Sequence, residues 1–352
     1  FVDIDDVLGL VEGYIHRVFK DAIGVELNLP FERLTYADVM SRFGTDKPDL
    51  RYGMELFDLS DAVRDCGFSV FSQTVQAGGS VQGITAKGGF TTLTRKEIDK
   101  LTEYVKGIGA KGLAWIRIGE DGSISSSFAK FLSEDEMSNI LKQVGAEAGD
   151  VVLIVGDTKK SLVYLTLGSL RATVAKQMNL INEGEYKFIW VTEFPFFEWD
   201  EDEGQFVAMH HPFTSPMDEC LDYLETDKAN VRAKAYDLVL NGIELSSGSI
   251  RITNPELQKR IFDLLGFSTE EAQSKFGYLL DAFKYGAPPH GGMGIGLDRL
   301  IMQMLSCESL RDVVAYPKVQ NASEPMTQCP AEVDLKQLKE LGLKLDISPQ
   351  KD

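Results

Sequence analysis

Two carboxylates on a predicted β-hairpin are the first residues that could do chemistry. Residues 235–252 read AYDLVLNGIELSSGSIRI, in which Asn241-Gly242 is a strong signal for a two-residue turn. Counting outward from this turn, we expect these residues to face each other: Leu240 and Ile243, Val239 and Glu244, Asp237 and Ser246. Asp237 and Glu244 then lie on one face as diagonal neighbours, roughly 6–8 Å apart.

Two carboxylates at this separation repel each other unless a cation or a base lies between them. Mg²⁺ held together with phosphate oxygens would suit them, because this ion takes few protein ligands and keeps substrate and water in its shell. The alternative is a solvated strand face, on which Asp237 and Glu244 simply point outward.

Arg251 follows Glu244 at an odd spacing, which places the two on opposite faces of an unbroken strand. The intervening segment 246–248 is Ser-Ser-Gly, and glycine in a strand often marks a bulge. We therefore predict a bulge within 246–248 that returns Arg251 to the carboxylate face. Its guanidinium could there hold a substrate carboxylate through two hydrogen bonds.

Two of the four histidines are adjacent, in MHHPFTSP at residues 209–216. Neighbouring residues on a strand point to opposite faces, so at most one of His210 and His211 should face a shared site. The alternative is a pair of hydrogen-bonding residues that shape a proline-bounded turn.

A glycine-rich stretch at residues 291–300 reads GGMGIGLDRL. It lacks the third glycine of the dinucleotide-binding fingerprint and the Gly-Lys-Ser/Thr of a P-loop. We predict a strand with Gly292, Gly294 and Gly296 on one face, where a flat ligand can lie, followed by an apolar helix. Arg299 at the start of that helix could stack on a base and contact phosphate. The alternative is that the glycines only allow close packing of strand and helix.

Composition excludes several classes of function. The 352 residues include 36 basic and 54 acidic ones, a net charge of −18, which argues against broad nucleic-acid binding but leaves room for a local basic path. No apolar run reaches the length of a membrane span and no signal peptide opens the chain. The sequence begins at Phe1 without an initiator Met, so we expect a fragment of a longer protein. Four dispersed cysteines predict free thiols in a reducing cytoplasm and no zinc site: Cys66, Cys220, Cys307 and Cys329.

Local signals predict the elements that carry these residues. Helices that begin at a capping residue are expected from Asp5 or Asp6 to Gly24, from Thr35 to Gly44, from Thr94 to near Gly107, from Ser133 toward Val144, and after Ser268. A glycine marks the end of each of the first three. Strands are expected at 68–71, 151–156, 187–199, before Met209, at 236–240 and at 243–252. The connections favour an α+β fold with a mainly antiparallel sheet over a parallel doubly wound one.

The motifs together resemble a known family. The stretches concerned are YGAPPHGGMGIGLDRL, GTDKPDLR, AMHHPFTSP, NGIELSSGSIRI and RDVVAYPK. They are similar to the bacterial-type aspartyl-tRNA synthetases of class II, with the first stretch as motif 3. The resemblance implies a catalytic domain in two parts, 1–61 and 187–352, around an inserted domain at 62–186 of the kind shared with tRNA-dependent amidotransferases.

On the nucleotide side, the resemblance implies that Gly296, Leu297, Asp298 and Arg299 line the ATP site. Arg299 would stack on adenine and contact the triphosphate. Catalysis would depend on Arg299 together with two residues of the hairpin, Arg251 and Glu244.

For the metal ion, the resemblance implies that Glu244, with Asp237, binds Mg²⁺ and the phosphates of ATP. Arg251 would hold the side-chain carboxylate of L-aspartate, and His210 would contact the same substrate.

The resemblance implies an aspartate–tRNA ligase that forms aspartyl-adenylate and transfers aspartate to tRNA-Asp, or to tRNA-Asn as well. The family's anticodon-binding domain, motif 1 at the homodimer interface and motif 2 would precede Phe1, so the fragment alone is expected to be inactive. The rival interpretations are an asparaginyl enzyme or asparagine-synthetase relative, and a non-catalytic paralogue that binds RNA or regulates an amidotransferase. A nicotinamide dehydrogenase is excluded by the glycine pattern.

Overall fold

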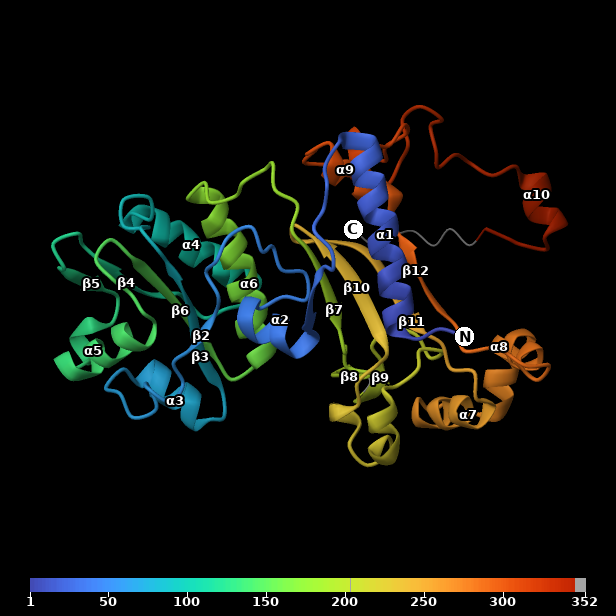
Figure 1. The fold of residues 1–352 in the computed structure, drawn as a ribbon, viewed down its shortest axis with the longest axis horizontal. Helices are drawn as coiled ribbons and strands as arrows, with labels where there is room; N and C mark the ends of the chain where they lie inside the picture. Colours follow the sequence, from blue (N-terminus) through green and yellow to red (C-terminus); the bar gives the residue numbers. More distant parts are fainter. Residues whose placement is uncertain (203, 346–352) are drawn as a thin grey trace. The chain divides into compact units, whose positions relative to one another are not determined.

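The computed structural model describes residues 1–202 and 204–345, which form two compact units, Phe1–Gly296 and the segment from Leu297 onward. The first unit contains two five-stranded sheets with helices, so the predicted α+β class is confirmed (Figure 1). The predicted division at 1–61, 62–186 and 187–352 stays a prediction.

The first sheet is mainly antiparallel, as predicted. Its strand order is β1-β7-β10-β11-β12, and only the outer pair β1–β7 is parallel. The bounds are β1 Glu32–Thr35, β7 Phe188–Thr192, β10 Ala235–Leu240, β11 Ile243–Ile250 and β12 Gly291–Ile295.

Helix α1 (Ile4–Ile23) lies along one face of this sheet (Figure 1). Its buried Glu12 accepts a hydrogen bond from Nε1 of Trp190 on β7, at 2.9 Å. The opposite face is covered at the β1–β7 side by α2 (Tyr36–Phe43), whose buried Val39 and Phe43 belong to the same core cluster as Ile189. On this second face, β11 and β12 lie beyond that cluster. Together with Asp237 of β10 they carry most of the candidate site.

The second sheet has the order β2-β3-β6-β4-β5 and is buried on both faces. Its strands are β2 Phe57–Asp58, β3 Ser80–Ala86, β4 Ala114–Ile118, β5 Ile124–Ser126 and β6 Val151–Asp157. One core lies between the sheet and helices α4 (Arg95–Ile108) and α6 (Lys160–Gln177), and another lies under α3 (Ser69–Gln76) and α5 (Glu134–Gln143). Burial on both faces explains why β6 reads as a continuous apolar run.

The remaining elements are shorter or lie outside the sheets. They are the hairpin β8 (Phe197–Asp200) and β9 (Gln205–Ala208), the helices α7 (Pro255–Leu264) and α8 (Thr269–Phe283), and, in the second unit, α9 (Leu297–Met304) and α10 (Leu335–Glu340).

Several predicted boundaries hold and three are wrong. The first helix is capped by Asp3, not by Asp5 or Asp6, because Asp3 and Asp6 form the capping box. Residues 68–71 enter helix α3 instead of a strand. The predicted strand 187–199 is interrupted between β7 and β8, where Glu193 has φ of 54° and Pro195 has no amide proton to donate.

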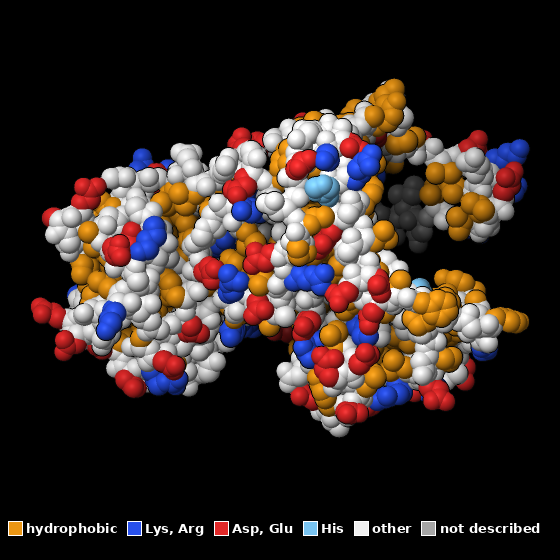
Figure 2. Space-filling view, viewed as in Figure 1, with side chains coloured by type: hydrophobic (Ala, Val, Ile, Leu, Met, Phe, Trp, Pro, Cys, Tyr) orange, Lys and Arg blue, Asp and Glu red, His pale blue; other side chains and the backbone are white. Residues whose placement is uncertain are grey.

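The surface carries charges of both signs. On the face drawn in Figure 2, Lys and Arg side chains are interspersed with Asp and Glu and form no continuous basic band among the described residues. In the part of the chain that the structure covers, no helix combines the length and apolar character needed to cross a membrane.

Candidate active site

A β-bulge sets which residues of the hairpin share a face. Leu240–Ile243 and Val239–Glu244 pair as predicted, but Asp237 faces Ser247 and not Ser246, because Leu245 is an extra residue on β11. The ladder through 246–248 is regular, so the predicted bulge position is wrong by one residue. Its consequence is nevertheless realised, since the extra residue restores the parity between Glu244 and Arg251.

Asp237 is a buried carboxylate with an unpaired oxygen. It is 4% exposed, and its Oδ1 has no hydrogen-bond partner. Burial raises its pKa to about 6, and Ser247 partly offsets this effect, while the nearby carboxylates Glu244 and Asp46 add to it. The solvated-face alternative therefore does not describe Asp237, which would gain from a cation at its free oxygen.

Lys47 is a site residue that the sequence analysis missed. Its ammonium lies 3.1 Å from Oε2 of Glu244 and 3.7 Å from Oδ2 of Asp46. Burial lowers the pKa of Lys47, but Asp46 and Glu244 outweigh this, so the pKa is raised overall. The one sequence signal for Lys47 is its place in GTDKPDLR, a stretch that resembles the family.

The turn of the hairpin packs against the loop that carries Lys47. Asn241 and Gly242 both have positive φ, of 52° and 84°, as a tight hairpin turn requires. A Cβ on Gly242 would lie 3.3 Å from Cβ of Asp49, so this glycine allows the close approach. The Asn241 amide also bonds the backbone of Glu185 and Lys187 at 2.8 and 3.0 Å, which fixes the turn.

Glycines of β12 form an open floor beside these carboxylates. Gly294 pairs with Ser247 and Gly292 with Ser249, so both glycines lie on the Asp237 face. A Cβ at either position would meet no atom within 4 Å, so close packing does not account for them. A flat ligand could therefore lie against this part of the strand.

The two histidines lie in a bend after β9 and not in a strand, so the argument from strand alternation does not apply to them. The ring of His210 lies edge-on to Phe194, with centroids 4.9 Å apart, and burial lowers its pKa although Asp46 and Glu244 oppose this. His211 lies 3.3 Å from the guanidinium of Arg251 and accepts a hydrogen bond from the Phe213 amide at 3.2 Å. His211 is thus a second neighbour of the site that the strand argument excluded.

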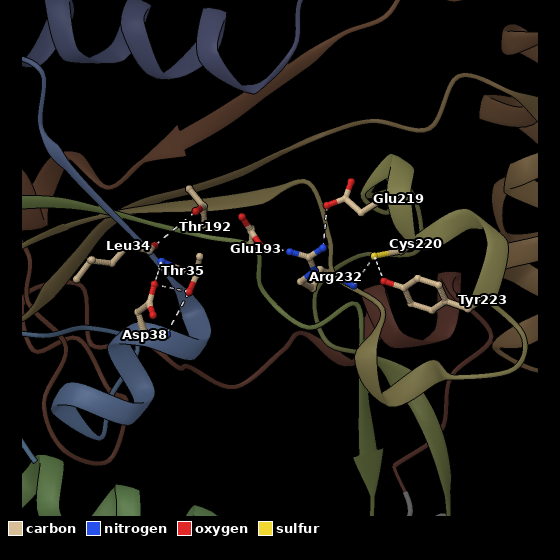
Figure 3. Close-up of polar contacts among 9 residues, drawn as sticks. All are labelled: Leu34, Thr35, Asp38, Thr192, Glu193, Glu219, Cys220, Tyr223 and Arg232. Carbon is tan, nitrogen blue, oxygen red and sulfur yellow. Dashed lines mark hydrogen bonds and ion pairs between the residues drawn. The ribbon is translucent and has the colours of Figure 1, made fainter. Parts of the chain in front are cut away.

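Helix α2, which leads into the Lys47 loop, is fixed at its start (Figure 3). Thr35 and Asp38 form a reciprocal capping box, with hydrogen bonds of 3.1 and 3.3 Å to the two backbone amides. Thr192 on β7 donates to the carbonyl of Leu34 at 3.4 Å and joins the cap to the sheet.

Arg232 ties the segment before β10 to its neighbours (Figure 3). Its guanidinium pairs with Glu193 and, at 2.7 Å, with Glu219. Its amide donates to Sγ of Cys220, which also accepts from the hydroxyl of Tyr223 at 2.9 Å. These contacts hold the chain that enters β10, so they position Asp237 indirectly.

Arg299, Asp298 and Leu297 begin helix α9 in the second unit, where the predicted helix is found. Gly296 ends the first unit and donates its amide to the carbonyl of Leu245 at 2.8 Å. The site residues whose geometry is described above therefore all belong to the first unit.

The arrangement suits the neutralisation of charge on a bound ligand. Within residues 1–202 and 204–345, no group of three or more His, Cys, Asp or Glu residues could hold a metal ion by itself. The buried Oδ1 of Asp237 with the neighbouring Glu244 fits an ion that takes the rest of its shell from a phosphate-bearing ligand and water.

These features describe an antiparallel sheet on which an open row of glycines lies beside a buried carboxylate. The model of the family "tRNA synthetases class II (D, K and N)" matches residues 1–320, and the chain belongs to this family.

Two curated relatives are similar to this chain over almost its whole length. The aspartate–tRNA ligase of Ruminiclostridium cellulolyticum is 55% identical over 345 residues, covering 98% of this chain and 58% of that protein. The aspartate–tRNA(Asp/Asn) ligase of Caldanaerobacter subterraneus subsp. tengcongensis is 54% identical over 347 residues, covering 99% of this chain and 58% of that protein. The chain thus spans little more than half the length of these relatives.

A solved structure, the asparaginyl-tRNA synthetase of Entamoeba histolytica in complex with asparaginyl-adenylate, matches with a TM-score of 0.40 and 16% identity. The match covers 92% of this chain and 47% of that one.

Proposed function

We propose that this chain provides the C-terminal part of the catalytic site of an aspartate–tRNA ligase. The observation that carries the proposal is the common face of Asp237, Glu244 and the glycine floor of β12, set by the Leu245 bulge. The family match and the names of the curated relatives support the choice of reaction.

In the proposed reaction, the α-carboxylate of aspartate attacks the α-phosphate of ATP and pyrophosphate leaves. A ribose hydroxyl of the terminal tRNA adenosine then attacks the carbonyl carbon of the adenylate, the aspartyl ester forms, and AMP leaves. Arg251 holds the side-chain carboxylate of aspartate through its guanidinium fork, and His210 contacts the same substrate. The glycines of β12 leave space for the nucleotide. Arg299 is assigned to adenine and the triphosphate, and this assignment rests only on the resemblance of the motif.

Asp237 and Glu244 would hold Mg²⁺, which supplies charge neutralisation for the phosphates when bound. The unpaired, buried Oδ1 of Asp237 supports this assignment. Catalysis then depends on positioning and on neutralisation of charge, and the proposed reaction needs no protein nucleophile.

Aspartate-dependent exchange of pyrophosphate into ATP tests the proposal, with the chain joined to the upstream segment present in its relatives. We expect exchange with aspartate and none with asparagine. Exchange with asparagine alone would favour an asparaginyl enzyme. No exchange with either amino acid would favour a non-catalytic paralogue.

The proposed partners are L-aspartate, ATP and tRNA-Asp, in a homodimer. The relatives include both aspartate–tRNA ligases and aspartate–tRNA(Asp/Asn) ligases, so charging of tRNA-Asp and tRNA-Asn transcripts has to be compared directly. Sedimentation of the longer protein tests the dimer. The four free cysteines support a place in the reducing cytoplasm.

A further inference from the structure

Arg171 is a buried cation outside the set of residues proposed to bind the substrates. It lies on α6 of the second sheet layer, and only 2% of it is exposed. Its guanidinium lies between two aromatic rings, 4.8 Å from the centroid of Phe43 and 4.4 Å from that of Tyr52. A charge buried so completely needs several specific partners.

The partners are backbone carbonyls of one irregular loop. Nη2 of Arg171 donates to the carbonyls of Asp49, Tyr52 and Gly53 at 2.8, 3.1 and 3.1 Å, and Nε donates to that of Met54 at 3.1 Å. The loop has no helix or strand of its own to satisfy these oxygens. The guanidinium fork therefore replaces secondary structure here.

Helix α6 also contacts the beginning of the same loop. A Cβ on Gly44 would lie 2.5 Å from the carbonyl oxygen of Tyr164, and one on Gly168 would lie 2.6 Å from that of Gly44. Tyr164, Gly168 and Arg171 lie on one face of the helix by their spacing. Both ends of the loop that carries Lys47 are thus held by α6.

We propose that Arg171 is a positioning residue that holds loop 45–54 in the form that presents Lys47 to Glu244. Through this loop, helix α6 of the second sheet influences the active site without supplying a side chain that binds the substrates. The kinetic part of its test rests on the proposed function, whereas the structural part does not.

The structural arm compares Arg171→Lys with wild type by hydrogen exchange. Lysine keeps the charge but cannot bond four carbonyls at once. We expect amides of 45–54 to exchange about tenfold faster or more, while those of β6 (Val151–Asp157) are unchanged. Arg117→Lys is the matched control, because Arg117 also stacks on a ring, that of Phe90, and donates to its carbonyl. Unchanged exchange in 45–54, or equal increases in both segments, would overturn the proposal.

The kinetic arm uses a double-mutant cycle in the longer protein. Lys47→Met alone and Arg171→Lys alone should each lower kcat/KM for aspartate-dependent exchange about tenfold. Lys47→Met should then cost less than about threefold in the Arg171→Lys background, since the loop is already misplaced. Costs that multiply would show that Arg171 acts only on global stability. If the wild-type protein itself shows no exchange, the proposed function fails, and the hydrogen-exchange arm still decides the role of Arg171.

Discussion

The ammonium of Lys47 lies 3.1 Å from a carboxylate oxygen of Glu244, so an irregular loop and a β-hairpin meet in one ion pair. The pair stands beside the buried Asp237, and Lys47 lowers the pKa that burial and the acidic neighbours raise. The acid–base behaviour of the site is therefore shared by two segments that are far apart in the chain.

Replacing Asp237 by Asn should remove a pH-dependent loss of stability. Burial raises the pKa of Asp237 from 3.8 to about 6, so its contribution is fully present below the ordinary value and is lost as the pH rises through about 6. This rise corresponds to roughly 3 kcal/mol. In denaturant unfolding without divalent ions, the free energy of unfolding of the variant minus that of wild type should increase by about this amount between pH 4 and pH 7.

Added Mg²⁺ provides the second half of that experiment. At pH 7 and with ATP present throughout, the ion should raise the Tm of wild type and leave that of Asp237→Asn unchanged, if Asp237 is a ligand. A parallel increase in both proteins would contradict the metal assignment.

Lys47→Met should move the pH dependence of Asp237 upward, because it removes the cation that favours the carboxylate. The measurement is the stability difference between proteins with Asp and Asn at position 237, repeated with Lys and with Met at position 47. Lys187→Met is the control, since Lys187 also pairs with a glutamate, Glu185, at 2.8 Å. An unchanged midpoint in the proteins that carry Lys47→Met would show that the ion pair has no influence on Asp237.

Arg251→Lys should lower kcat/KM for aspartate about 100-fold with little change in the KM for ATP. Lysine keeps the charge but loses the two parallel hydrogen bonds to a carboxylate, which are worth about 3 kcal/mol. Arg260→Lys serves as the control, because Arg260 forms a comparable fork with Glu225 on the surface of α7. Equal losses with aspartate and ATP would argue against a role in recognition of the amino acid.

Gly294→Val and Gly248→Ala should have opposite consequences. Position 294 has open space above it, so the protein should fold with a normal Tm while the KM for ATP rises at least tenfold. At position 248 a Cβ would clash with the carbonyl oxygen of Gly292 and lie 2.5 Å from Cβ of Met293, which should cost about 1–3 kcal/mol. Thermal unfolding and exchange kinetics separate the two effects, and normal ATP binding by Gly294→Val would refute the glycine floor.

Local rules were sufficient for the parts of the site that lie close together in the chain. The Asn241-Gly242 turn determines the first two residue pairs of the hairpin, because turn geometry acts over a few residues. The face shared by Gly292 and Gly294 follows from strand alternation in the same way. The helix from Thr35 to Gly44 was correct because its capping box and its glycine end are both local.

Effects that depend on packing could not be read in advance. Gly248 looked like the bulge, but it is a glycine because its neighbours leave no space for a Cβ. The bulge lies at Leu245, whose side chain gives no backbone signal. Lys47 pairs with Glu244 only because the loop and the hairpin pack together in the folded chain. In the same way, Arg171 holds the Lys47 loop only when helix α6 packs against it.

The Leu245 bulge makes this active site sensitive to chain length and not only to residue identity. Removing that single residue would leave every proposed ligand in the sequence, in the same order. It would nevertheless exchange inner and outer positions for Ser247, Ser249 and Arg251 relative to Glu244. The presence of the one extra residue is thus a functional property of this hairpin. A sequence alignment that places a gap at Leu245 would pair residues that face opposite sides of the sheet.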